Sequence, residues 1–259
     1  MTTSRWLRAL RATRETLLDL VLPSFCQRCG PAVDDDALPG LCEACLSELT
    51  FDPPGPRCPV CAAPLVHRLT ARDRQGRTRC LDCRRKRPRH RQVLAVGPFQ
   101  GPLAELIIRL KYGGERILGQ SLGELLAETW RQQAPDLGPW SALVLPIPLS
   151  TERRAERGFN QSDLIARPLA ARLGLRLDTA ALQRQGQGPA QTGRNRHARL
   201  AGVSGRFLTT SSRVWGRSIV LVDDVMTTGA TLRAATRSLF AGGALAVSWA
   251  VVARTPSPR

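Results

Sequence analysis

The stretch Ile219-Val-Leu-Val-Asp-Asp-Val-Met-Thr-Thr-Gly-Ala-Thr231 decides the fold of this chain. Four apolar residues predict a buried strand, and two carboxylates, Asp223 and Asp224, follow at its carboxyl end. A short loop of small and hydroxyl-bearing residues comes next, and we expect a helix to begin near residues 228–229. The first amides of a helix lack partners within it and lie at the positive end of its dipole. This loop can therefore hold a phosphate dianion, and the acidic pair beside it suits diol hydroxyls or a metal ion.

The segments around this stretch alternate between short apolar runs and longer helical patterns. We expect strands over residues 93–96, 142–145, 219–222 and 246–252. We expect helices over residues 103–111, 117–131, 159–173 and 230–240, the third with Pro168 as a possible kink. Such alternation is typical of βαβ units, which predicts an α/β fold with a twisted, mostly parallel sheet flanked by helices. Ligands of such sheets bind at the carboxyl ends of the strands.

A second group of residues suits the same kind of ligand. An apolar run over residues 143–150 leads into a proline-fixed turn, and Arg153, Arg154 and Arg157 follow it. Arginines bind phosphate oxygens in pairs of hydrogen bonds, so several on one loop can hold a pyrophosphate; the alternative is a basic helix start. We expect Arg157 to open a helix that includes Asn160. Lys111, at the end of another expected helix, adds a positive arm.

All eight cysteines lie before residue 84, in four C-x-x-C pairs. Four thiolates complete a tetrahedral zinc shell, so eight ligands predict two structural zinc ions in a small Cys-rich zinc-ribbon module. Consecutive pairs can share an ion, or the two sites can interleave. Disulfides are disfavoured because no secretion signal is evident. We expect surface roles for His67 and His90. The predicted ligands are Cys26, Cys29, Cys42, Cys45, Cys58, Cys61, Cys80 and Cys83.

Composition and charge narrow the class of protein. The chain has 259 residues, a net charge of +17 and no long apolar run, which excludes integral membrane proteins, collagens and coiled coils and favours a cytoplasmic location. Residues 68–91 carry eleven Lys or Arg against two acids, a pattern that favours a polyanionic partner or reflects an arginine bias. Residues 1–22 predict a basic amphipathic helix that docks on its own protein or lies on an anionic membrane.

The order of four motifs after the cysteine pairs is specific. The chain carries LKYGG at 110–114, PIPLSTERRAERGFNQS at 146–162, QTGRNRHARLAGVSGRF at 191–207 and VDDVMTTGAT at 222–231. It resembles the ComF/GntX family, whose members have a type I phosphoribosyltransferase fold after an N-terminal double zinc ribbon. The resemblance covers residues 21–253 and implies a double zinc ribbon over 23–87 and a phosphoribosyltransferase-like domain over 93–255. These follow the helix expected over 1–22, and we expect residues 84–91 to be the linker between them.

This resemblance also implies a ligand, phosphoribosyl pyrophosphate (PRPP) or a related compound with Mg²⁺. The acidic pair would contact the ribose hydroxyls directly or through Mg²⁺, the loop would hold the 5-phosphate, and Lys111, Arg153, Arg154 and Arg157 would hold the pyrophosphate. The implied PRPP-binding residues are Asp223, Asp224, Val225, Met226, Thr227, Thr228, Gly229, Ala230 and Thr231.

Two readings of activity stay open. As a pentosyl transferase, the protein would close residues 191–207 as a lid. Transferases of 6-oxopurines carry a third acid where this chain has Thr227, which disfavours hypoxanthine or guanine as acceptor, and His197 is a weak candidate base. No catalytic residue is assigned. As a non-catalytic protein of DNA uptake, it would bind single-stranded DNA through its basic segments or recruit a helicase or other uptake partner.

Overall fold

The computed structural model divides the chain into two compact units, Met1–Leu49 and Thr50–Arg259, each described by itself. The predicted helix over 1–22, His67, His197 and all of 191–207 except Phe207 lie outside the described residues. In the part of the chain that is described, no helix is both long enough and apolar enough to cross a bilayer. The structure describes residues 25–31, 38–49, 51, 55–65, 70–72, 76–83, 88–133, 142–185 and 207–255.

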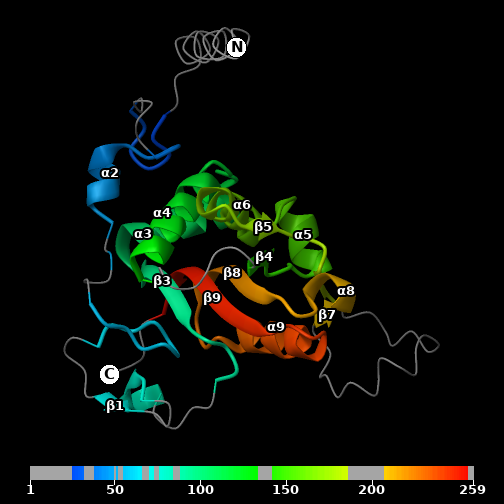
Figure 1. Ribbon diagram of the computed structural model, residues 1–259. Helices are drawn as coiled ribbons and strands as arrows, with labels where there is room; N and C mark the ends of the chain where they lie inside the picture. Colours follow the sequence, from blue (N-terminus) through cyan, green and yellow to red (C-terminus); the bar gives the residue numbers. More distant parts are fainter. Residues whose placement is uncertain are drawn as a thin grey trace, which may run out of the picture. The chain divides into compact units, whose positions relative to one another are not determined.

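A five-stranded parallel sheet forms the centre of the second unit (Figure 1). Its order is β3-β9-β8-β4-β5, and every neighbouring pair is parallel. Every residue of β3 and nearly every residue of β8 and β9 is buried, as expected for a parallel sheet covered on both faces. This arrangement confirms the predicted α/β fold class. The strands are β3 (Val93–Pro98), β4 (Ala142–Pro146), β5 (Arg176–Leu177), β8 (Ser218–Met226) and β9 (Ala246–Arg254).

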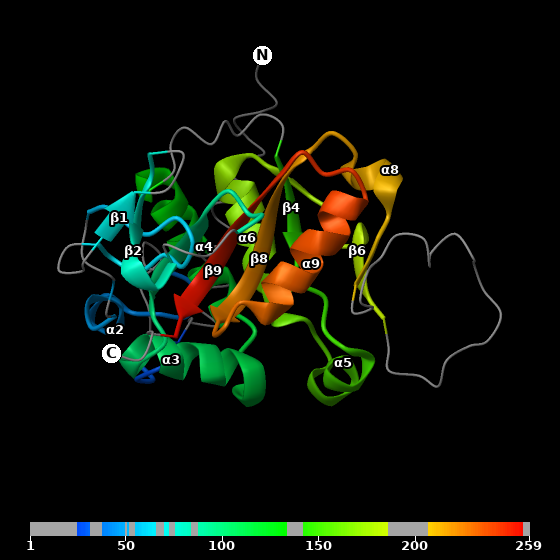
Figure 2. The same cartoon turned by 90° about the horizontal axis from the view of Figure 1, so that it is seen from below.

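Helices cover both faces of this sheet. Figure 1 shows α4 and α6 on one face and α9 on the other, and Figure 2 shows α9 lying along β8. The expected helix over 103–111 is interrupted, because α3 ends and a π-helical turn, η2, follows it. The helical elements of this region are α3 (Gly101–Ile108), η2 (Arg109–Gly113), α4 (Leu118–Gln133), α5 (Thr151–Arg157), α6 (Gln161–Leu173), α8 (Ser211–Val214) and α9 (Ala230–Ala241).

Glycines let α4 and α6 approach closely. A Cβ on Gly123 would lie 2.3 Å from Cγ of Pro168 and 2.4 Å from the carbonyl oxygen of Ile165. A Cβ on Gly119 would lie 2.6 Å from Cβ of Leu164. This close packing holds α6 in place, with Pro168 inside the helix, and so positions the amino-terminal turn of α6 that forms part of the site described below.

The second unit also contains a cysteine-rich part that is attached to the sheet. Strands β1 (Thr70–Arg72) and β2 (Thr78–Cys80) pair antiparallel, and a 3-10 turn, η1 (Leu81–Cys83), follows them. The N–H of Val93 donates to the carbonyl of Pro59 over 3.1 Å, and Ala62 belongs to the same buried core cluster as the sheet residues. The boundary between the two compact units therefore falls between the second and third cysteine pairs.

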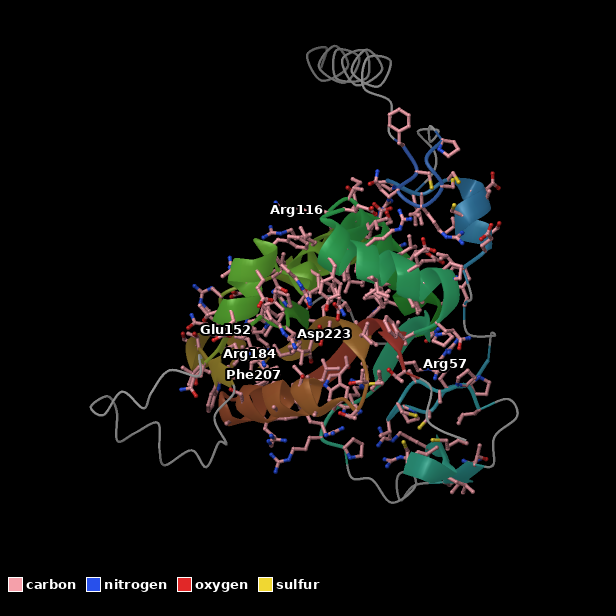
Figure 3. All side chains as sticks on the ribbon, turned by 180° about the vertical axis from the view of Figure 1, so that it is seen from behind. Arg57, Arg116, Glu152, Arg184, Phe207 and Asp223 are labelled. Atoms are coloured by element: carbon pink, nitrogen blue, oxygen red, sulfur yellow. The ribbon has the colours of Figure 1, made fainter. Side chains whose placement is uncertain are left out.

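Two smaller features were not expected from the sequence. Strands β6 (Leu182–Arg184) and β7 (Phe207–Thr209) form an antiparallel hairpin, with the Arg184 guanidinium 5.8 Å from the centre of the Phe207 ring (Figure 3). In the first unit, the short helix α2 (Glu43–Ser47) begins at Cys42, whose Sγ accepts a hydrogen bond from the N–H of Cys45.

Candidate functional site

The acidic pair lies inside β8, and not after it as the sequence predicts, because the strand continues to Met226. Asp223 Oδ1 accepts a hydrogen bond of 2.9 Å from Oγ of Ser162 on α6 and one of 3.0 Å from the N–H of Asp224. Oδ2 of Asp224 lies 2.9 Å from Nζ of Lys111 on η2. Two neighbouring carboxylates are thus held by two different helical segments.

Both carboxylates are removed from water, with 9% of Asp223 and 4% of Asp224 exposed. Burial, reinforced by the negative charge of Asp224, raises the pKa of Asp223 to about 7. Two adjacent buried acids repel each other, and Lys111 supplies one compensating charge. The donor set of two carboxylates suits a divalent cation such as Mg²⁺, which prefers oxygen ligands.

A turn after β8 carries the predicted phosphate-binding residues. Thr227 and Thr228 are exposed, and Gly229 adopts a left-handed conformation with φ of 71° as the N-cap of α9. A Cβ on Gly229 would lie 3.2 Å from Nη1 of Arg233 and 3.3 Å from the Trp249 ring, so the backbone here passes close to both side chains. The strand, the turn and the start of a helix follow in the predicted order.

The Thr-rich turn is held by local hydrogen bonds. The N–H of Ala230 donates to Oγ1 of Thr228 over 3.3 Å, and Nη1 of Arg233 donates to the carbonyl of Thr228 over 2.7 Å. Arg233 is exposed and adds positive charge at the amino-terminal end of α9, where the helix dipole is also positive. An anion is favoured at this end of α9 by both effects.

The arginines predicted to hold a pyrophosphate lie on a short helix, α5, whose N-cap is Ser150. Arg153 and Arg154 are exposed on this helix. Arg157 ends α5 and does not open the next helix, so that expectation is wrong. The reason is local, because Gly158 adopts a left-handed conformation with φ of 73° and stops the helix.

Asn160 then starts α6 as its N-cap. Its Oδ1 accepts from the N–H of Ser162 over 3.1 Å, and its Nδ2 donates to the carbonyl of Ile147 over 3.0 Å. The amide therefore ties the start of α6 to the chain that leaves β4. This contact places Ser162 where its hydroxyl reaches Asp223.

Three regions that are distant in sequence meet around the acidic pair: η2, the junction of α5 with α6, and β8. The Arg157 guanidinium lies 4.9 Å from the centre of the Tyr112 ring, and its Nη1 donates to Oε1 of Gln161 over 2.9 Å. Tyr112 follows Lys111 on η2. The end of α5, the start of α6, η2 and β8 are thus linked through Arg157, Lys111 and Ser162.

Three residues of the site were missed by sequence reasoning. Ser162 stands within a quoted motif, and its place in the first turn of a helix was the only signal of a role. Trp249 reads as an ordinary strand residue, yet its Nε1–H donates to Oγ1 of Thr236 on α9 over 2.8 Å. Gln161 stands in the same motif and the same turn as Ser162, and is buried beside Arg157.

The cysteines gather into two groups of four, so consecutive pairs share a site. Within each group the sulfur atoms all lie within 4.8 Å of one another. The Sγ atoms of Cys29 and Cys42 are 3.5 Å apart, and those of Cys61 and Cys80 are 3.8 Å apart. These separations are too long for disulfides and match the edge of about 3.8 Å for a tetrahedron with Zn–S bonds of about 2.3 Å.

Both groups therefore suit a structural zinc ion. The first cluster is Cys26, Cys29, Cys42 and Cys45, in the first unit. The second cluster is Cys58, Cys61, Cys80 and Cys83, in the second unit.

His90 is buried, contrary to the surface role expected for it. Only 5% of the residue is exposed, and its ring centre lies 3.7 Å from that of Trp249. Burial lowers the pKa of His90 to about 4, so the ring is neutral at pH 7. Nε2 lies 3.2 Å from the carbonyl oxygen of Val60, which only accepts, so Nε2 carries the proton.

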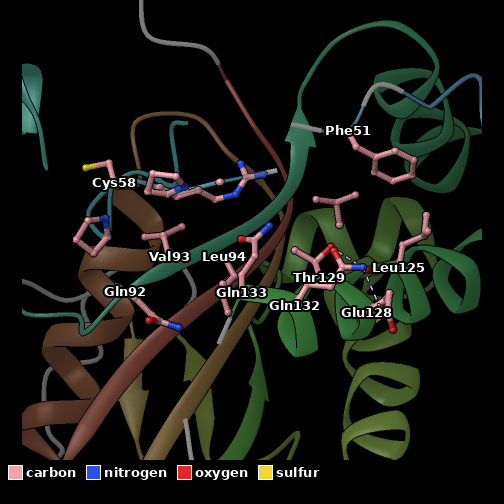
Figure 4. A pocket seen from close by; sticks show the side chains of 15 residues that line it. Phe51, Cys58, Gln92, Val93, Leu94, Leu125, Glu128, Thr129, Gln132 and Gln133 are labelled. Atoms are coloured by element: carbon pink, nitrogen blue, oxygen red, sulfur yellow. Dashed lines mark hydrogen bonds between the residues drawn. The ribbon is translucent and has the colours of Figure 1, made fainter. Parts of the chain in front are cut away.

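The second unit also has a cavity of about 730 Å³, which Figure 4 shows from close by. Its walls come from the loop before Cys58, from the start of β3 and from α4, with Phe51, Gln92 and Thr129 among the lining residues. None of the lining residues belongs to the acidic pair or the Thr-rich turn. The cavity is therefore separate from the site built on β8.

Comparisons with known proteins agree with this arrangement. A family model described as a phosphoribosyl transferase domain matches residues 161–259, and one described as a double zinc ribbon domain matches residues 17–84. The DNA utilization protein YhgH of Escherichia coli K12 is 30% identical over 227 residues, which cover 83% of this chain and 91% of that protein.

A second relative and a solved structure are also similar to this chain, but only the relative is similar enough to support a conclusion. The competence protein ComFC of Bacillus subtilis is 31% identical over 214 residues, which cover 78% of this chain and 79% of that protein. The structure of the glutamine PRPP amidotransferase from B. subtilis aligns with 51% of this chain and 25% of that chain, with 20% identity and a TM-score of 0.36. At that TM-score the structural likeness supports no conclusion about activity.

Proposed function

The chain belongs to the ComF/GntX family, and we propose that its phosphoribosyltransferase-like domain binds PRPP, or a related phosphoribosyl ligand, together with Mg²⁺. One observation carries the proposal. A buried carboxylate pair, Asp223 and Asp224, stands on β8 directly before a turn that leads into the amino-terminal end of α9. A sugar phosphate needs both features, because its hydroxyls donate to carboxylates and its phosphate binds free amides.

Different residues of this site bind different groups of the ligand. Asp223 and Asp224 bind the ribose 2′- and 3′-hydroxyls, and the turn binds the 5-phosphate through its amides and threonine hydroxyls. Gly229 lets the backbone approach the phosphate because it has no Cβ. We assign PRPP binding to Asp223, Asp224, Val225, Met226, Thr227, Thr228, Gly229, Ala230 and Thr231.

Mg²⁺ fits this site because two carboxylates lie in adjacent positions and their mutual repulsion favours a bound cation. When bound, the ion would neutralise charge on the ligand's diphosphate. Lys111 holds Asp224 at 2.9 Å in the structure, and we propose that it turns to the pyrophosphate when the ligand and Mg²⁺ arrive. Arg153, Arg154 and Arg157 bind the same pyrophosphate from α5.

The reaction class that this ligand supports is pentosyl transfer, in which a nucleophile displaces pyrophosphate from the sugar. Lys111 and the arginines would stabilise the charge that grows on the leaving group. Thr227 stands where 6-oxopurine transferases carry an acid, and threonine is not a base near neutral pH, which disfavours hypoxanthine or guanine as the acceptor. Two relatives are named for DNA utilization and competence, and we propose that this protein also acts in DNA uptake.

Isothermal titration with PRPP and Mg²⁺ tests the proposal. The wild type should bind saturably, and the double variant Asp223→Asn with Asp224→Asn should lose at least 100-fold in affinity, because the neutral amides bind the cation far more weakly and their NH2 groups cannot accept hydrogen bonds. Glu128→Gln, an exposed acid on α4, is the matched control and should bind like the wild type. A wild type that binds no PRPP, but binds a single-stranded oligonucleotide as tightly as the double variant does, would overturn the proposal.

A further inference from the structure

Trp249 packs against the proposed phosphate-binding turn and against α9. Its side chain is 1% exposed, and its Nε1–H donates to Oγ1 of Thr236 in the middle of α9. Its ring also lies 3.3 Å from the position that a Cβ on Gly229 would occupy. A shift of this indole therefore moves both the N-cap of α9 and the helix behind it.

His90 connects this indole to the second cysteine cluster. The two rings are tilted by 31° with their centres 3.7 Å apart, and His90 Nε2–H donates to the carbonyl of Val60. Val60 lies between two cluster residues, Cys58 and Cys61. One row of buried groups thus runs from the metal-binding turn through the imidazole and the indole to Gly229.

Backbone hydrogen bonds connect the same segments as these side-chain contacts. The N–H of Val93 donates to the carbonyl of Pro59, and the N–H of Trp249 donates to the carbonyl of Gln92 over 2.9 Å. Ala62, which follows Cys61, is fully buried in the same core cluster as Trp249. Backbone and side chains therefore both attach the turn of the second cluster to β9.

We propose that the second cysteine cluster positions the phosphate turn, with His90 and Trp249 as the positioning residues, so that loading of this cluster with zinc tightens binding of the phosphoribosyl ligand. The effect on the ligand rests on the proposed function, whereas the effect on the turn does not. The four sulfurs fix the carbonyl of Val60 only when a metal holds them together. Without the metal the Val60 carbonyl moves, the buried His90 N–H loses its acceptor, and the packing beneath Gly229 loosens.

The first cluster provides the matched comparison. It has the same four donors, but it belongs to the first compact unit, whereas Val60, His90, Trp249 and Gly229 all belong to the second. Loss of one zinc from the first cluster should therefore leave the turn unchanged. This difference separates a positioning effect from a general effect of zinc loss.

Hydrogen exchange on the ligand-free protein tests the proposal directly. Cys83→Ser and Cys45→Ser should each reduce the zinc content from two ions to one per chain. The amides of Ala230 and Arg233 have acceptors in this turn, Thr228 Oγ1 and the Gly229 carbonyl, and we expect both to exchange at least tenfold faster in Cys83→Ser and at the wild-type rate in Cys45→Ser. PRPP affinity should fall about tenfold in Cys83→Ser alone.

A second variant keeps the test decisive if Cys83→Ser does not fold. His90→Phe retains an aromatic ring against Trp249 and both zinc ions but removes the hydrogen bond to Val60. It should also speed exchange at the amides of Ala230 and Arg233. Equal exchange in the wild type, His90→Phe and Cys83→Ser would overturn the inference, whereas a wild type that binds no PRPP would overturn only the proposed function.

Discussion

The two cysteine clusters have the same donors in the same C-x-x-C spacing, yet their surroundings differ. In the first cluster Cys29 is exposed and Cys42 half-buried, whereas in the second only Cys61 is not fully buried. The turn of the second cluster is joined to the sheet by His90, by the Pro59 carbonyl and by Ala62. The same metal-binding motif therefore stabilises different parts of the molecule, depending on what packs against its turn.

This difference has an energetic consequence. Among the described residues of the first unit, the buried apolar side chains apart from cysteine are Leu41 and Leu49, which is too little core for residues 25–31 and 38–49 to fold stably by themselves. We therefore expect metal binding to supply much of the free energy that folds these residues. The second cluster has a small core of its own, and Ala62 beside it belongs to the separate, larger core of the sheet, so the sheet should stay folded without this metal.

The largest expected effect is therefore on the first unit. Cys45→Ser should abolish the amide protection of residues 25–49, because the apparent contribution of a structural zinc ion is about 10–16 kcal/mol and exceeds what this small core supplies. Cys83→Ser should leave the amides of β8 and β9 protected. Hydrogen exchange by mass spectrometry measures both, and a protected first unit in zinc-depleted Cys45→Ser protein would contradict the comparison.

The next effect is a pH dependence confined to the second unit. The folded protein keeps the pKa of His90 at about 4, against 6.5 for an ordinary histidine, so between these values the unfolded chain binds a proton that the folded chain does not. The contribution of neutral His90 to the unfolding free energy should be complete above pH 6.5. It should be lost as the pH drops from about 6.5 to about 4, by about 3 kcal/mol in total.

Chemical denaturation of the wild type and His90→Phe at several pH values checks this effect. Both proteins also lose zinc in acid, so the quantity of interest is the difference between them, which should change by about 3 kcal/mol across this window. The first unit has no histidine, since the three in the chain are at 67, 90 and 197. A difference that is constant with pH would show that His90 is protonated as easily in the folded as in the unfolded state.

A smaller effect is expected at the far end of the contacts from the second cluster. Gly229→Ala should cost about 1–2 kcal/mol for a left-handed alanine, plus the displacement of Trp249 by the new methyl group. Gly174→Ala is the matched control, because φ is 64° there and no atom lies within 4 Å of the added Cβ. Thermal unfolding should show a larger loss for Gly229→Ala, and PRPP titration should show weaker binding for that variant only.

Much of the fold follows from local pattern. Long periodic segments predicted α4, α6, α9 and the main strands, because a run of apolar residues at a fixed spacing needs no knowledge of the rest of the chain. The β6–β7 hairpin and β5 have three residues or fewer per strand, which is too short to show a period. The pairing of the cysteines also needed the structure, because both arrangements satisfy the spacing.

The candidate site also has one part that the sequence predicts and another that only the structure shows. Asp223, Asp224 and the turn after them are contiguous, so their chemistry can be recognised in the sequence. Ser162 acts from 61 residues away, and the stacking of His90 on Trp249 joins segments 159 residues apart. Such contacts arise from tertiary packing, and no local signal records them. The burial of His90 in particular depends on a strand at the other end of the chain.

The smallest expected effect is on zinc binding by the first cluster when a surface ion pair is removed. Nη1 of Arg28 lies 2.6 Å from Oε2 of Glu48, and this ion pair connects the first C-x-x-C turn to the end of α2. The Glu48 side chain is 59% exposed, so water and salt screen the pair, and its contribution should be about 0.5 kcal/mol. Glu48→Gln should therefore weaken zinc binding by the first cluster about two- to threefold in low salt and not measurably in 0.5 M NaCl. Competition with a zinc-binding dye, in the Cys83→Ser background so that only the first cluster reports, measures this change. A loss greater than tenfold would show that this surface ion pair stabilises the first cluster as strongly as buried contacts stabilise the second. The two clusters would then differ less in stability than their burial indicates.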